Sequence, residues 1–162
     1  MMSAMKFSHE IQYTAAADDV YAMLAEQAFR EQVCDACHAV DRTVQITPSA
    51  DGMDVVVDQT LPGDGIPSFA KKLVGDRIQV VQSERWTSPT NAALEVNIPG
   101  KPGQLRGTVT LTERGGETVK IVDGDIKVSI PLVGGKLEGL IGDLFRSALR
   151  AESRVGARWL AD

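Results

Sequence analysis

The residue types most suggestive of chemistry are Cys34, Cys37 and His38, which form a C-x-x-C-H string. This spacing is the covalent attachment signature of a c-type haem. It also supplies three of the four ligands of a structural zinc site, and a C-x-x-C pair can act as a redox dithiol. On a helix, residues three and four apart lie on one face, so the three side chains are expected to be neighbours.

The surrounding sequence argues against each of these chemistries. Haem attachment follows export, and the first residues lack the charged and apolar regions of a secretory signal. Zinc needs a fourth ligand, for which only His9 or a carboxylate such as Asp41 is available. A redox pair works at a helix N-terminus, whereas this pair is expected near a helix C-terminus. We therefore predict no metal and no cofactor, with Cys37 packed as a small apolar side chain and Cys34 at its edge.

A second group of candidates lies on the first predicted strand. His9 falls between Phe7 and Ile11 on the apolar face. It is either a hydrogen-bonded core histidine or a polar anchor or acid/base group inside a cavity. Tyr13 ends the same strand with a hydroxyl that needs a partner if it is buried.

Glu84 and Trp86 share their parity with Ile78 and Val80, which predicts that they face inward. A buried carboxylate is costly without a partner. Glu84 therefore lies at a cavity mouth, forms hydrogen bonds inside, or is carried to solvent by local twist. Trp86 is expected to form a cavity wall or part of the core.

The composition is that of an ordinary globular protein. The 162 residues are 43% hydrophobic and 24% charged, with a net charge of −5, and predict a single domain over 1–162. The net charge is negative and no basic run reaches five residues, which argues against nucleic acid as a partner. No apolar run reaches 18 residues, which argues against integral membrane association. We expect a cytoplasmic protein with reduced thiols.

Periodicity predicts one strand, two short helices, six further strands and a long helix. The first strand covers 6–13. The first short helix begins near residue 16, and the second covers 29–38. The long helix covers 133–160, where apolar residues recur three and four apart. The remaining strands are expected at 40–47, 53–61, 77–87, 92–98, 104–112 and 118–130, with a glycine- and proline-rich loop at 61–67 and a short helical turn at 68–74.

The last predicted strand changes its alternation. Val119 and Ile121 are apolar at odd positions, but Ile126 and Val128 are apolar at even positions. A shift of one residue turns every side chain to the other face. We therefore predict a β-bulge at Gly124 that restores the facing.

This order of elements predicts an α+β fold, in which an antiparallel sheet packs one face against the long helix. A curved sheet does not close on one helix everywhere. A cavity between them is expected, and such cavities are usual ligand sites.

Three segments resemble the START-like (SRPBCC, helix-grip) superfamily, and in particular an uncharacterised bacterial branch related to polyketide cyclases and lipid-transport proteins. The segments are "FAKKLVGDRIQVVQSERW" (69–86), "IPGKPGQLRGTVTL" (98–111) and "DGDIKVSIPLVGGKLEGLIGDL" (123–144). The resemblance implies a curved antiparallel sheet of about seven strands wrapped on the C-terminal helix, with two short helices after the first strand.

The first functional hypothesis is a carrier or sensor that binds a small apolar molecule, such as a lipid or polyketide-like compound, between the sheet and the last helix. Loop 61–67 with Phe69 is expected to act as a lid. His9, Tyr13 and Glu84 are expected to supply the polar contacts. The predicted ligand-binding residues are Phe7, His9, Ile11, Tyr13, Phe69, Val80, Glu84, Trp86, Val96, Leu137, Ile141 and Phe145.

Two other hypotheses remain open. The second is an enzyme of the aromatase/cyclase or hydrolase type acting on the same ligand, with His9 as base and Tyr13 or Glu84 as acid. The third is a protein-interaction module that presents an arginine face of the last helix to an acidic partner; this face consists of Arg146, Arg150, Arg154 and Arg158.

Overall fold

A computed structural model describes residues 4–64 and 66–162, and its elements follow the predicted order. The first strand, β1, covers Met5–Tyr13, and two short helices follow it, α1 (Ala17–Leu24) and α2 (Gln27–Ala36). The longest helix, α4, covers Gly134–Ala161. The other elements are β2 (Asp41–Pro48), β3 (Met53–Pro62), α3 (Ser68–Val74), β4 (Arg77–Ser88), β5 (Asn91–Asn97), β6 (Gln104–Arg114) and β7 (Glu117–Lys127).

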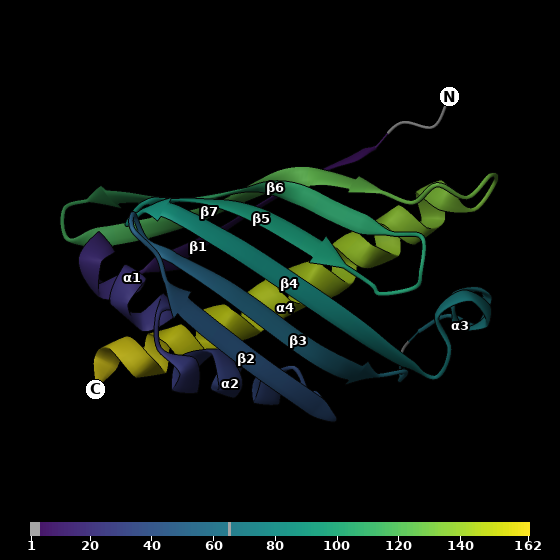
Figure 1. The fold of residues 1–162 in the computed structure, drawn as a ribbon, viewed down its shortest axis with the longest axis horizontal. Helices are drawn as coiled ribbons and strands as arrows, with labels where there is room; N and C mark the ends of the chain where they lie inside the picture. The colour runs from purple at the N-terminus through teal and green to yellow at the C-terminus, as the bar shows by residue number, and fades with distance from the viewer. Residues whose placement is uncertain (1–3, 65) are drawn as a thin grey trace.

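The strands form one antiparallel sheet in the order β1-β7-β6-β5-β4-β3-β2. Strands β2 to β7 run as a meander, and β1 completes the sheet beside β7. Helix α4 crosses one face of this sheet, from the end that carries α3 to the end that carries α1 and α2 (Figure 1). The α+β helix-grip prediction is confirmed, including the two short helices after the first strand.

Helix α4 does not lie equally close to all strands. It packs most extensively against β1 and α2, and Gly156 brings it close to Tyr13 of β1. A Cβ on Gly156 would lie 2.5 Å from the Tyr13 ring, so only glycine allows this contact. Toward β3, β4 and β5 the space under the helix is filled by side chains from both layers, and it is there that the packing leaves gaps.

The predicted β-bulge at Gly124 is wrong. Strand β7 pairs with β1 and β6 without a register shift, so that Gly124 lies opposite both Phe7 and Gly107. The even-numbered residues of β7 face inward along the whole strand, and these include Thr118 and Lys120. The sequence pattern misled because two polar side chains occupy inward positions and are buried with partners.

Apolar side chains form two clusters. The larger extends from β1 under the middle and the C-terminal half of α4, where Phe7 meets Phe145 and Phe29 meets Trp159 with ring centroids 5.3 and 5.7 Å apart. The smaller lies under α3 and the start of α4, and its buried members are Ile66, Ala70, Ile78, Val128 and Leu137. No helix in the described residues combines the length and apolar character of a membrane span, since α4 is long but amphipathic.

Candidate ligand-binding site

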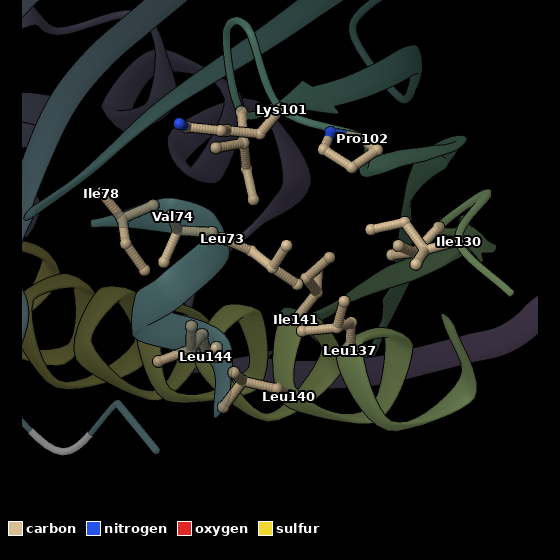
Figure 2. A pocket seen from close by; sticks show the side chains of 13 residues that line it. Leu73, Val74, Ile78, Lys101, Pro102, Ile130, Leu137, Leu140, Ile141 and Leu144 are labelled. Carbon is tan, nitrogen blue, oxygen red and sulfur yellow. The ribbon is translucent and has the colours of Figure 1, made fainter. Parts of the chain in front are cut away.

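Three hollows lie in a row between α4 and the sheet. The outer hollow lies beneath α3, has a volume of about 30 Å³ and is almost wholly aliphatic. Figure 2 shows Leu73 of α3 pointing toward Leu137 and Ile141 of α4. Lys101 and Pro102, from the β5–β6 loop, line another side of this hollow. Its lining residues are Ala70, Leu73, Val74, Ile78, Ile98, Lys101, Pro102, Val128, Ile130, Leu137, Leu140, Ile141 and Leu144.

The other two hollows continue the row along α4. The middle hollow, of about 50 Å³, shares Ile78, Ile98, Ile141 and Leu144 with the outer one. The inner hollow, of about 30 Å³, shares four lining residues with the middle one. Each holds about one or two water-sized molecules, and the row passes from aliphatic to polar lining. The residues shared by the middle and inner hollows are Gln59, Gln82, Phe145 and Ala148.

The polar end of the row is held by a buried ion pair. Arg30 donates from Nη1 and Nη2 to the two Glu84 oxygens at 2.9 and 2.8 Å, and from Nε to the Leu24 carbonyl at 2.8 Å. Gln82 Nε2 and Trp86 Nε1 also donate to Glu84, at 2.6 and 2.9 Å. Burial alone would raise the pKa of Glu84, but the Arg30 charge and its hydrogen bonds outweigh burial and hold this pKa well below its usual range.

A second buried polar group links β7 to α4. Lys120 Nζ donates to both Glu152 oxygens at 2.8 and 2.9 Å, and Tyr13 Oη donates to Glu152 Oε2 at 2.6 Å. Burial, and then the Glu152 charge, raise the pKa of Tyr13 far above its usual value. Tyr13 is therefore a fixed hydrogen-bond donor, and Lys120 compensates the only carboxylate that α4 contributes to the inner hollow.

Gln59 differs from these groups because it has an unused acceptor. It lies on the inner face of β3, opposite Val80 of β4, and lines both the middle and the inner hollow. Within the described residues, its Oε1 is the one buried side-chain oxygen or nitrogen without a hydrogen-bond partner. Such orphaned groups are rare because an unmade hydrogen bond is costly.

The predicted ligand-binding residues separate into distinct places. Five of them line the hollows: Val80, Val96, Leu137, Ile141 and Phe145. Phe69 lies on the surface of α3 with 40% of its area exposed, and residue 65 of the predicted lid lies outside the described residues. The others that are fully buried belong to the closed core or to the polar groups just described: Phe7, Ile11, Tyr13, Glu84 and Trp86.

His9 lies away from the three hollows. It is half-buried on the edge strand β1 and faces α4. Burial, followed by the charges of Arg146 and Arg150, lowers its pKa and so favours the neutral imidazole. Arg146 itself stacks over the Phe7 ring, with its Cζ 4.8 Å from the centroid, while Arg150, Arg154 and Arg158 are exposed.

The C-x-x-C-H string sits at the end of α2. The predicted packing of its cysteines is reversed: Cys34 is the buried thiol, at 1% exposure, and Cys37 is half-buried. Burial raises the pKa of each to about 11, so both remain protonated thiols. His38 adopts a positive φ of 62° just beyond the helix, and no group of three metal-ligating side chains gathers in the described residues.

Sequence reasoning did not identify Arg30, Gln59, Gln82, Lys120 and Glu152. One signal was available: Lys120 interrupts the apolar alternation of its strand. A charged residue at an inward position requires a buried counter-charge, and on the amphipathic α4 pattern Glu152 occupies the gap between Ala148 and Val155.

Comparison with known proteins identifies the family of the chain. A family model described as a protein of unknown function (DUF2505) matches residues 8–160. An uncharacterized protein of Mycobacterium tuberculosis is 28% identical over 117 residues, which cover 68% of this chain and 67% of the relative.

Solved structures share the fold at low sequence identity. The Zhui aromatase/cyclase of Streptomyces sp. R1128 has a TM-score of 0.62 at 14% identity, over 95% of this chain and 92% of the enzyme. A START superfamily protein of Mycobacterium smegmatis has a TM-score of 0.58 at 14% identity, over 93% and 96%. With a helix-grip fold of the START type and a match over nearly its whole length, the chain belongs to the DUF2505 family of proteins of unknown function.

Proposed function

We propose that the protein binds a small, largely apolar molecule in the row of hollows between α4 and strands β3 to β5. The observation that carries this proposal is the row itself, since three adjoining gaps along one helix are unusual in interiors that are otherwise close-packed. Their lining is mostly aliphatic with a few polar groups at one end, as in typical ligand sites.

The ligand enters by widening the outer hollow. As they stand, the hollows are too small for a lipid, so a bound chain must separate side chains of α3 from those of α4. Helix α3 is suited to this, because it has only seven residues and a single fully buried one, Ala70. Phe69, with 40% of its area exposed, lies on the moving element. This makes α3, together with the described part of loop 61–67, the entrance.

A carrier or sensor agrees with the state of the polar groups better than an enzyme does. A catalytic base or acid needs a free proton position near the substrate. Tyr13 and Glu84 are committed to hydrogen bonds with Glu152 and Arg30, and His9 does not line the hollows. On the arginine face of α4, Arg146 stacks over the Phe7 ring and the other three arginines are exposed, which gives no specific support to an acidic partner.

The test fills the middle and inner hollows with a larger side chain on α4. Ala148 faces the middle and inner hollows, whereas its neighbour Ser147 is exposed. Ala148→Phe should abolish the fluorescence gain of Nile red, a neutral apolar dye, while Ser147→Phe should retain it. Near-ultraviolet circular dichroism checks that each variant is folded, and Ala148→Leu provides a milder filling.

The proposal also predicts cargo. Native mass spectrometry of protein purified from its own host should show a bound apolar compound that is lost from Ala148→Phe. Equal dye binding by wild type and Ala148→Phe, with both folded, would contradict the proposed site.

A further inference from the structure

We infer that the preferred ligand is an uncharged molecule whose apolar chain ends in a hydroxyl group, and that Gln59 binds this hydroxyl. The inference deepens the proposed function and rests on it. It follows from which polar groups at the inner end of the row are already used and which one is not.

The charged groups at the inner end compensate each other. Arg30 and Lys120 provide two positive charges, and Glu84 and Glu152 provide two negative charges. Every one of these side chains is nine-tenths or more buried. An ionised ligand head placed here would have to leave water without a free counter-charge, which is costly. The inner end therefore selects against carboxylates and amines.

The hydrogen-bond partners of these groups are also committed. Glu84 accepts from Arg30, Gln82 and Trp86, and Glu152 accepts from Lys120 and Tyr13. Each nitrogen of Arg30 also has a partner, since Nη1 and Nη2 donate to Glu84 and Nε donates to the Leu24 carbonyl. A ligand cannot replace any of these bonds without leaving a buried partner unsatisfied.

Among the buried side-chain oxygens and nitrogens of the described residues, Gln59 Oε1 is the exception. It is buried, lacks a partner, and belongs to a side chain that lines the junction of the middle and inner hollows. A hydroxyl donates one hydrogen bond and carries no charge. It can therefore bond to the unused acceptor of Gln59 without needing a counter-charge. An apolar chain attached to it would extend through the middle hollow toward the aliphatic outer hollow under α3.

Lys101 marks the opposite end of the row and gives the competing orientation. Its side chain is exposed and lines the outer hollow. A fatty acid could be held there by its carboxylate with the chain pointing inward. The two orientations differ in the head group they favour, so matched ligands distinguish them.

The experiment compares 1-decanol, 1-chlorodecane and decanoate, each titrated into labelled protein and followed by NMR shifts of the backbone and glutamine side-chain amides. Wild type should bind 1-decanol about tenfold more tightly than 1-chlorodecane, with decanoate weakest at pH 8. The Gln59 side-chain amide should shift with the alcohol only.

Gln59→Leu should bring 1-decanol down to the affinity of 1-chlorodecane and leave 1-chlorodecane unchanged or tighter. Gln79→Leu is the matched control, because Gln79 is exposed on β4 and donates to Asp58; it should bind all three ligands as wild type does. Since Gln59→Leu removes an orphaned acceptor, it should also raise the urea midpoint of the ligand-free protein.

The outcomes separate the two proposals. Binding of all three ligands without a preference for the alcohol, or a preference that survives Gln59→Leu, would overturn the inference and leave the apolar site standing. If decanoate binds more tightly than 1-decanol, and Lys101→Met removes this difference, the inference would be replaced by the orientation in which the carboxylate binds Lys101 and the chain points inward. If none of the three ligands binds, the inference falls together with the proposed function.

Discussion

The two halves of α4 are packed in opposite ways. The C-terminal half is fixed by the Lys120–Glu152–Tyr13 group and by aromatic contacts. Helix α2 lies beside this half (Figure 1) and carries Arg30, which pairs with Glu84. The N-terminal half faces aliphatic side chains with gaps between them. Its one buried polar anchor is Glu138, which accepts from the Val128 amide at 2.9 Å.

This difference separates stability from binding within one helix. Buried ion pairs require exact partners, so the end that contains them tolerates little movement. Aliphatic side chains can slide and repack at small cost. The polar end therefore positions α4, and the apolar end can open for a ligand without loosening the rest.

The largest effect is expected from breaking the Arg30–Glu84 pair. Glu84→Gln keeps the size of the side chain but leaves Arg30 buried without its counter-charge. We expect a loss of about 3–5 kcal/mol in the free energy of unfolding, measured by urea denaturation. The double variant Arg30→Gln/Glu84→Gln should recover part of this loss. A loss below about 1 kcal/mol in the single variant would contradict a rigid polar end.

The same pair gives a pH dependence with a defined sign. The folded-state pKa of Glu84 lies below its unfolded value, which is about 4.3. The stabilisation by the pair is therefore fully present above that pH and is lost as the pH falls toward the folded-state pKa. Between pH 6 and pH 3, wild type should lose more stability than Glu84→Gln. Parallel curves for the two proteins would refute the assignment.

A slightly smaller effect is expected at Lys120. Lys120→Met leaves Glu152 buried with only the Tyr13 hydroxyl as partner, and we expect a loss of about 3 kcal/mol in the free energy of unfolding. Lys120→Met/Glu152→Gln should be more stable than the single variant. Lys127→Met, at an exposed position of the same strand, should stay within about 0.5 kcal/mol of wild type. Equal effects at both lysines would mean that Lys120 does not face inward.

The thiols test the boundary between the two regions, where α2 meets the inner hollow. At pH 8, iodoacetamide should alkylate Cys34 and Cys37 on the order of a hundredfold more slowly in the folded protein than in concentrated urea, because a pKa near 11 leaves few thiolates. Peptide mapping assigns each rate, and Cys37 should react before the more buried Cys34. Fast alkylation of either residue in the folded protein would show that the C-x-x-C-H sequence contains a reactive thiol.

The fold was accessible from the sequence because it depends on patterns that repeat. Alternation located every strand, and the spacing of apolar residues located α4, since burial of one face produces both. The alternation misled in β7, where Lys120 is buried by a partner that lies 32 residues away on α4. No local pattern records such a pairing.

The site was only partly accessible for the same reason. Apolar wall residues such as Val80, Ile141 and Phe145 follow from periodicity alone. The position of a gap does not, because it depends on how far α4 stands from each strand. His9 illustrates the limit: its parity is inward, but its strand lies at the sheet edge beside α4, away from the hollows.

The smallest effect is expected at α3, and it compares the two ends directly. Leu73→Ala removes a half-buried side chain from the outer hollow, and neighbouring side chains can fill a gap that already exists. We expect a loss below about 1 kcal/mol in the free energy of unfolding. Leu24→Ala makes the same change in α1 at a fully buried position and should cost about 2–5 kcal/mol. If the two substitutions cost the same, the outer hollow is as closely packed as the polar end, and α3 is not the element that opens.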